Sequence, residues 1–200
     1  DEGIGWVLDA LARKGAADNT LVVFTSDNGG ERFSNNWPFV GQKMDLLEGG
    51  IRVPLIARWP ARIASSALHS VPNLTMDWTA TMLDAAGVAA HPDYPLDGKS
   101  MLSALDDPHE HMPRDLFWRM KHRTQRAVIR GDWKWLSIEG NEFLFNLAKD
   151  ERERANFARR RPDVFVKLKK SYEAWERSLP TYSDATFSVV NTRADLATPS

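Results

Sequence analysis

The residues best suited to chemistry lie just after a short apolar run near the beginning of the chain. Residues 21–24 are rich in β-branched and aromatic side chains, which predicts a strand buried on both faces. Asp27 and Asn28 follow this run, and two glycines come next. Ligands bind past the carboxyl ends of strands in open α/β sheets. A carboxylate beside a carboxamide offers oxygen ligands to a hard cation such as Ca²⁺ or Mg²⁺, whereas a Zn²⁺ or Mn²⁺ hydrolase would more often show histidine here.

The same residues have a simpler interpretation, because Asp, Asn and Gly are also common in tight turns. The sequence downstream favours the metal site over the simple turn. Four short motifs follow one another in order: Thr25-Ser26-Asp27-Asn28-Gly29, Asn36-Trp37-Pro38, Gly41-Gln42-Lys43 and Glu48-Gly49-Gly50-Ile51-Arg52-Val53-Pro54. Their order and spacing resemble the second signature region of the sulfatase family, a branch of the alkaline-phosphatase superfamily. The resemblance continues more weakly to about Leu179.

The resemblance implies roles for three side chains. In sulfatases an Asp-Asn pair ligates a divalent cation, usually Ca²⁺, so Asp27 and Asn28 are the expected metal ligands here, with Mg²⁺ as a second option. The family lysine that precedes Glu-Gly-Gly contacts the sulfate ester, and its match is Lys43, the expected catalytic and substrate-binding residue. A cation and an ammonium group would both stabilise the charge that develops on the sulfate. Arg52 is expected to pair with a buried carboxylate instead, because it leads into another apolar strand.

The resemblance also implies groups that this sequence does not encode. The family nucleophile is a formylglycine derived from a Cys- or Ser-led motif, and the chain has no cysteine and no such motif. The upstream aspartates, lysine and histidine of the family site have no match either. We therefore predict the C-terminal portion of a sulfatase, which comes from a truncated gene, from a split gene or from an incomplete stretch of the protein. Alone it is not expected to turn over sulfate esters efficiently. The expected partners are a sulfate-ester small molecule or a sulfated glycan, and the missing N-terminal half.

Two alternatives stay open. The first is a phosphodiesterase or phosphonate monoester hydrolase of the same superfamily, which Asn28 disfavours because two-metal relatives usually carry His there. The second is a non-catalytic glycan-binding module that would stack sugars on Trp118, Trp133 and Trp135, although core packing explains these residues more simply.

Composition excludes other classes. A net charge of −1 argues against nucleic-acid binding. No apolar run approaches the ~18 residues of a membrane span. The absence of cysteine leaves the compartment undecided between periplasm or secretion and cytoplasm.

The predicted elements give an α/β fold, the C-terminal part of an alkaline-phosphatase-like sandwich, over residues 1–105. The spacing predicts helices over residues 1–14, 75–86 and 101–105, strands over 21–24 and 53–59, and a short extended piece over 70–73. Thr75 is the predicted N-cap of the second helix. Residues 29–48 form a predicted active-site loop that carries Lys43 inward. Asp77 and Asp84 are predicted to be ordinary solvated acids on a helix.

Residues 106–180 are predicted to form a second unit, a small antiparallel sheet covered by a helix. Strands are expected over residues 115–120, 126–130, 133–138 and 142–147, with a helix that begins at Pro162. His109 and His111 are considered as metal ligands, and His122 and Arg123 as substrate contacts; exposed loops explain all four more simply. Residues 181–200 are predicted to be a tail.

Overall fold

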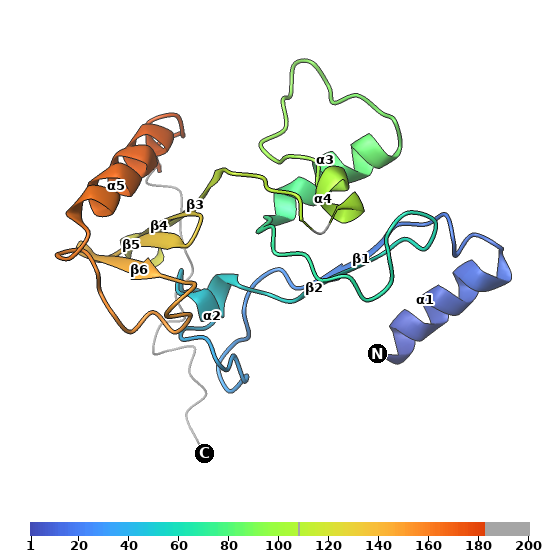
Figure 1. The fold of residues 1–200 in the computed structure, drawn as a ribbon, viewed down its shortest axis with the longest axis horizontal. Helices are drawn as coiled ribbons and strands as arrows, with labels where there is room; N and C mark the ends of the chain where they lie inside the picture. The colour runs from blue at the N-terminus through green and yellow to red at the C-terminus, as the bar shows by residue number, and fades with distance from the viewer. Residues whose placement is uncertain (108, 183–200) are drawn as a thin grey trace. The chain divides into compact units, whose positions relative to one another are not determined.

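The computed structural model describes residues 1–107 and 109–182. Its elements, shown in Figure 1, are α1 (Glu2–Arg13), β1 (Val22–Thr25), α2 (Glu48–Ile51), β2 (Leu55–Arg58), α3 (Thr75–Ala85), α4 (Leu102–Asp106), β3 (Asp115–Met120), the 3₁₀ turn η1 (His122–Thr124), β4 (Gln125–Arg130), β5 (Trp133–Ile138), β6 (Asn141–Asn146) and α5 (Pro162–Glu176). The predicted α/β class with a small antiparallel sheet and a C-terminal helix is confirmed.

The chain divides into two compact units. The first contains residues 1–27 and 54–112, and the second contains residues 28–53 and everything from Pro113 onward. Residues 28–53, called the motif loop below, therefore group with the second unit, although the sequence placed them in the first domain. The predicted boundary near residue 106 stays a prediction. Most of the predicted tail lies outside the described residues.

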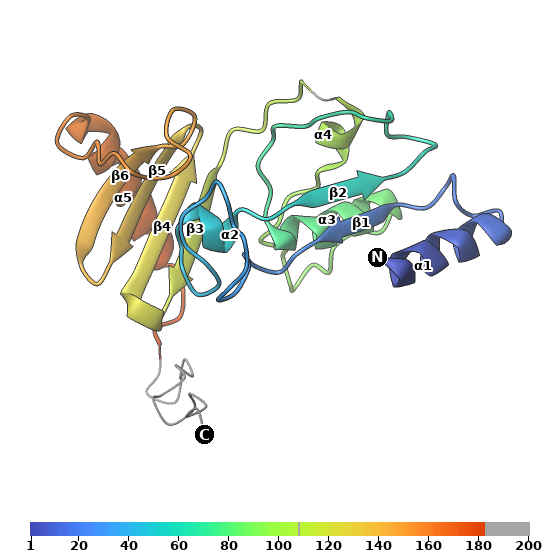
Figure 2. The same ribbon diagram turned by 90° about the horizontal axis from the view of Figure 1, so that it is seen from below.

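In the first unit β1 and β2 form an antiparallel ribbon in which Phe24 lies opposite Ile56 (Figure 2). One face of the ribbon packs against Trp78 of α3 and against α4. Phe24 and Ile56 belong to the other face, where they are 47% and 62% exposed. The prediction that the first strand is buried on both faces is therefore wrong for the described residues, which cover one face of the ribbon.

Helix α3 corrects a second prediction. Asp77 is fully buried, and its carboxylate accepts hydrogen bonds from the backbone N–H groups of Leu74, at 2.6 Å, and Lys99, at 2.9 Å. Leu74 is the N-cap and Thr75 is the first helical residue. Asp77 was predicted to be solvated because sequence spacing does not reveal that two backbone donors converge on it; Asp84 is exposed as predicted. Residues 70–73 are irregular rather than extended into a strand.

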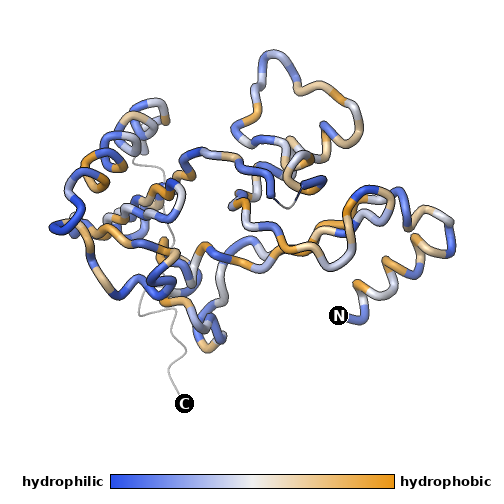
Figure 3. The backbone as a smooth tube through the Cα atoms, viewed as in Figure 1, coloured by the Kyte–Doolittle hydropathy of each residue, from blue (hydrophilic) through white to orange (hydrophobic). Residues whose placement is uncertain are grey.

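Helix α1 contains no buried residue, and apolar and polar residues alternate along it (Figure 3). Gly15, with a φ of 66°, follows the helix, as the sequence predicts for a helix end. None of the helices in the described ranges is long and apolar enough to cross a membrane.

The second unit is a 4-stranded sheet of order β3-β4-β5-β6, with all neighbours antiparallel. One face packs against Leu168 and Tyr172 of α5 through Val128, Trp135 and Leu144. The opposite face packs against the motif loop: a second cluster joins Leu46, Leu47 and Ile51 to residues Ala127, Leu136 and Phe145. The sheet thus has a helix on one side and the motif loop on the other, as Figure 2 shows.

Candidate metal and sulfate site

Asp27 and Asn28 lie where the sequence places them, in a bend that Ser26 separates from the end of β1. The Thr25 hydroxyl donates a hydrogen bond to the Pro54 carbonyl at 3.1 Å and so ties the end of β1 to the chain that enters β2. Asp27 is exposed and Asn28 is half-buried. The role of this pair as metal ligands stays a prediction.

Glycines let the two ends of the motif loop touch backbone to backbone. The Gly29 N–H donates to the Gly50 carbonyl at 2.8 Å, and a Cβ on Gly29 would lie 1.8 Å from the Gly49 oxygen. The Gly49 N–H donates to the Val40 carbonyl at 2.7 Å. A Cβ on Gly50 would lie 2.1 Å from the Asp45 oxygen. No other residue type fits these positions without moving backbone.

Lys43 is brought back beside this turn by the backbone. Its N–H donates to the Gly30 carbonyl at 2.9 Å. The Asn36 side chain fixes the same place, since it accepts from the Gly30 N–H at 3.0 Å and donates to the carbonyls of Gly30 at 3.2 Å and Gly41 at 3.1 Å. The backbone of Lys43 is therefore fixed close to the residues that follow Asn28.

The Lys43 side chain is on the surface. Its Nζ lies 3.2 Å from Oε2 of Glu31, and the two side chains are 44% and 68% exposed. Such a pair contributes about 0–1 kcal/mol to stability. The catalytic and sulfate-binding roles of Lys43 stay predictions.

Arg52 pairs with a buried carboxylate, as predicted. Its Nη1 lies 3.9 Å from Oε2 of Glu48, whose side chain is 4% exposed. The guanidinium also lies 4.8 Å from the centre of the Phe39 ring. Arg52 is thus a structural residue of the motif loop.

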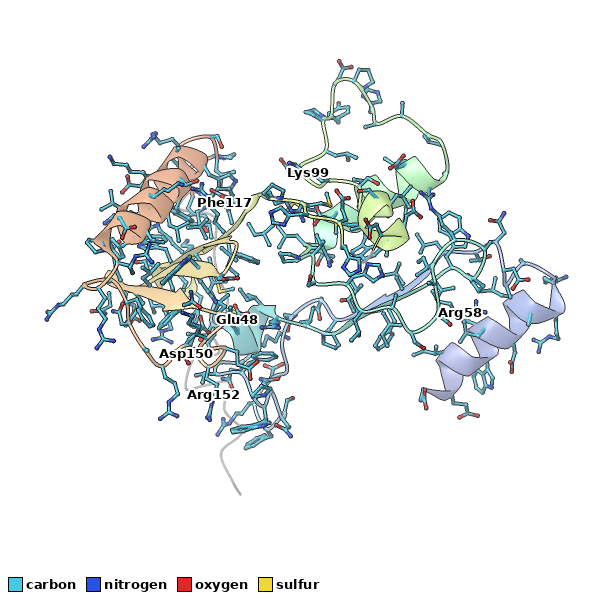
Figure 4. All side chains as sticks on the ribbon, viewed as in Figure 1. Glu48, Arg58, Lys99, Phe117, Asp150 and Arg152 are labelled. Atoms are coloured by element: carbon cyan, nitrogen blue, oxygen red, sulfur yellow. The ribbon has the colours of Figure 1, made fainter. Side chains whose placement is uncertain are left out.

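The groups that surround Glu48 were not among the predicted site residues. Nζ of Lys134 lies 2.9 Å from Oε1 of Glu48 and 2.8 Å from Oε1 of Glu153, and all three side chains are almost completely buried. Oε2 of Glu153 accepts a hydrogen bond from the Glu48 N–H at 2.6 Å. Burial raises the pKa of Glu153 and Lys134 opposes that rise. Figure 4 labels Glu48 on α2, where this charged cluster joins the motif loop to the sheet.

One signal could have revealed this cluster. Lys134 stands among apolar residues in the middle of a strand, and a buried lysine needs carboxylate partners. Its partners could not be named, because Glu48 and Glu153 are distant from it in the sequence.

The remaining candidates find other contacts. His109 and His111 lie on an irregular segment, and the described ranges contain no group of three or more His, Cys, Asp or Glu side chains placed to hold a metal ion. Arg123 lies 3.6 Å from Asp45 and 3.4 Å from Glu139. Substrate contact by His122 stays a prediction.

The tryptophans of the sheet serve packing. Trp135 is 3% exposed and its ring lies 5.1 Å from that of Tyr172. Trp133 meets the Phe157 ring edge-on at 5.8 Å. These contacts disfavour a sugar-stacking platform on the sheet.

Comparison with known proteins gives the class of this chain. The sulfatase family model matches residues 1–88. N-acetylgalactosamine-6-sulfatase of Rattus norvegicus is 34% identical over 140 residues, which are 67% of this chain and 26% of that protein. A sulfatase of Formosa agariphila is 31% identical over 209 residues, which cover 88% of this chain and 37% of that protein.

Solved structures also resemble this chain. The crystal structure of Ps i-CgsB superposes with a TM-score of 0.76 at 29% identity, over 87% of this chain and 40% of that one. The same protein has been solved in complex with k-i-k-neocarrahexaose. The phosphonate monoester hydrolase of Agrobacterium radiobacter superposes with a TM-score of 0.57 at 22% identity, which shows a shared fold alone.

The fold is of the alkaline-phosphatase-like α/β class. The chain belongs to the sulfatase family. It spans between 26% and 40% of the length of the relatives named above.

Proposed function

We propose that this chain supplies the cation-binding and sulfate-binding side of a sulfuric ester hydrolase. Asp27 and Asn28 are the proposed ligands of a divalent cation, and Lys43 is the proposed contact to the sulfate ester. The observation that carries the proposal is the backbone hydrogen bond from Lys43 to Gly30, at 2.9 Å, which holds the lysine beside the turn of the Asp-Asn pair.

The residues of this turn fit a hard cation. The carboxylate of Asp27 and the carboxamide oxygen of Asn28 are the donor types that Ca²⁺ prefers, and Asp27 is open to solvent. Ca²⁺ takes six to eight oxygen ligands, so this pair supplies part of the set and other residues must complete it. Mg²⁺ is a second option. The bound cation would polarise a sulfate oxygen.

The residues of this chain do not fit the family nucleophile. The chain has no cysteine and no Ser-led motif from which a formylglycine could be made. The ammonium group of Lys43 would bind and orient the sulfate and stabilise its developing charge, but it does not attack. We expect the chain alone to bind sulfate without hydrolysing p-nitrophenyl sulfate, and a segment that carries the nucleophile to be its partner.

The test is calorimetric titration of inorganic sulfate into the chain in the presence of CaCl₂. Lys43→Ala should weaken sulfate binding by roughly tenfold to a hundredfold, because it removes a charge-assisted hydrogen bond. Asp27→Ala should remove the dependence of sulfate binding on Ca²⁺. Glu31→Gln should strengthen binding slightly, since it frees Lys43 from its exposed partner.

Lys149→Ala is the matched control, because Lys149 is another exposed lysine of the same unit. Its sulfate affinity should equal that of the unchanged chain. The proposal fails if Lys43→Ala binds sulfate as tightly as this control.

Sulfated sugars are the proposed substrate class. The support is the naming of the relatives, which include an N-acetylgalactosamine-6-sulfatase, and the neocarrahexaose complex of Ps i-CgsB. A sulfated sugar should therefore bind more tightly than inorganic sulfate in the same titration, while its unsulfated counterpart should not bind.

The fold shared with a phosphonate monoester hydrolase supports a second candidate function. Asn28 argues against it, because a carboxamide suits a hard cation and an imidazole suits a transition metal. The unchanged chain should bind sulfate better than phenylphosphonate in the presence of Ca²⁺, and Asn28→His with Mn²⁺ should shift that preference toward phenylphosphonate. An unchanged chain that prefers phenylphosphonate would favour the second function.

A further inference from the structure

One side chain of the sheet forms hydrogen bonds with the backbone of the residues directly after Lys43. Gln125, the first residue of β4, is fully buried. Its Oε1 accepts a hydrogen bond from the Leu46 N–H at 2.9 Å, and its Nε2 donates to the Met44 carbonyl at 2.7 Å. A buried carboxamide thus places both its acceptor and a donor on the backbone next to Lys43.

The backbone at Met44 has an unusual conformation. Met44 has a φ of 77°, in the left-handed region that side chains other than glycine rarely adopt. The Asp45 N–H closes the same turn by donating to the Gln42 carbonyl at 2.9 Å. A non-glycine residue keeps such a conformation only where its surroundings hold it. Gln125 supplies two of the hydrogen bonds that hold this turn, one to the Met44 carbonyl and one from the Leu46 N–H.

The position of Lys43 depends on this turn. Lys43 immediately precedes Met44, and its N–H reaches the Gly30 carbonyl. If the φ of Met44 relaxed to a negative value, the direction of the chain before it would change and this hydrogen bond would be lost. Leu46, 2% exposed in the cluster that includes Leu136, anchors the other side of the turn.

We propose that Gln125 is a positioning residue for Lys43: its carboxamide holds the left-handed turn at Met44 and so keeps Lys43 beside Gly30. The inference rests on the proposed function in one respect: a displaced Lys43 weakens sulfate binding only if Lys43 contacts the sulfate. It assigns to the sheet of the second unit a share in shaping the sulfate site.

The test uses Gln125→Met, which keeps the side-chain volume and removes the hydrogen bonds to the Leu46 N–H, to the Met44 carbonyl and, at 3.2 Å, to the His122 carbonyl. Hydrogen exchange followed by NMR should show the Lys43 amide exchanging at least tenfold faster, while amides of β5 keep their protection. Sulfate affinity in CaCl₂ should fall by roughly tenfold. Adding Met44→Gly to Gln125→Met should restore much of the Lys43 amide protection and much of the sulfate affinity, because glycine adopts a positive φ without strain. Adding Met44→Ala should restore neither.

Gln125→Glu is the second variant, used if Gln125→Met does not fold. It keeps the acceptor for Leu46 and loses the donor to the carbonyls of Met44 and His122. It should therefore give the same selective loss of Lys43 protection.

The inference is overturned if exchange accelerates equally in the motif loop and the sheet, or if Met44→Ala rescues as well as Met44→Gly. The outcomes also separate it from the proposed function. If amide protection follows the expected pattern while sulfate binding ignores Lys43, the positioning role of Gln125 stands and the proposed sulfate contact fails.

Discussion

Replacing Lys134 by methionine should lower the free energy of unfolding by about 3–5 kcal/mol, because it leaves buried charge without a partner. Glu48 and Glu153 would then face each other with no cation between them, and both are nearly inaccessible to water. Methionine fills a similar volume, so the loss reports charge rather than a cavity. Urea unfolding of the unchanged protein and of Lys134→Met measures this loss of free energy.

The same variant should show a changed dependence on pH. Burial raises the pKa of Glu153 above its ordinary value, and Lys134 counteracts that rise. Because the folded-state pKa is the higher one, the folded chain binds more protons between the two values, and stability is lost as the pH rises through the folded pKa. Without Lys134 this pKa rises further, so Lys134→Met should lose more stability at pH 8 than at pH 5.

Glu153→Gln is the matched control for this prediction. It leaves Lys134 and Glu48 as a neutral pair and removes the carboxyl group whose pKa is raised. Its loss of stability should therefore be smaller than that of Lys134→Met and nearly independent of pH over the same range. Equal losses in the two variants would contradict a charged cluster centred on Lys134.

Gly29→Ala should disrupt the motif loop, with a loss of more than about 4 kcal/mol or failure of the loop to fold. The added Cβ would lie 1.8 Å from the Gly49 oxygen, and a backbone atom cannot turn away as a flexible side chain can. The hydrogen bond from Gly29 to Gly50 would be lost as the two segments separate. Sulfate binding should disappear with it, because the same contacts position Lys43.

Gly5→Ala is the control for this variant. Gly5 lies inside α1, and a Cβ there would meet nothing within 4 Å. Alanine is the better helix former by roughly 0.5–1 kcal/mol, so this change should be neutral or stabilising. Urea unfolding and the NMR spectrum of residues 28–53 measure both variants. A Gly29→Ala chain with unchanged stability would show that the two ends of the motif loop do not pack as described.

Local patterns were sufficient for much of the fold. The strands of the second unit and the helix that begins at Pro162 are confirmed within one or two residues, because alternation and helical spacing are recorded in neighbouring residues. The position of Asp27 and Asn28 after a strand is confirmed for the same reason. Their chemistry was inferred from a motif, and it stays a prediction that the sulfate titrations test.

Local patterns failed wherever burial depends on distant residues. The pattern of residues 21–24 predicts a strand covered on both faces, yet Phe24 is 47% exposed because the described residues pack on the other face of the ribbon. Asp77 read as solvated, yet two backbone donors enclose it.

The sequence by itself determined the family, the helices and strands, and the glycines that allow the motif loop to close. The tertiary structure alone decided that Lys134 and Glu153 surround Glu48, and that Gln125 holds the turn after Lys43. The physical reason is that secondary structure follows from contacts between residues close in the chain. Pairing of buried charges and hydrogen bonds follows from which distant segments share the same dry interior, and no local pattern records that.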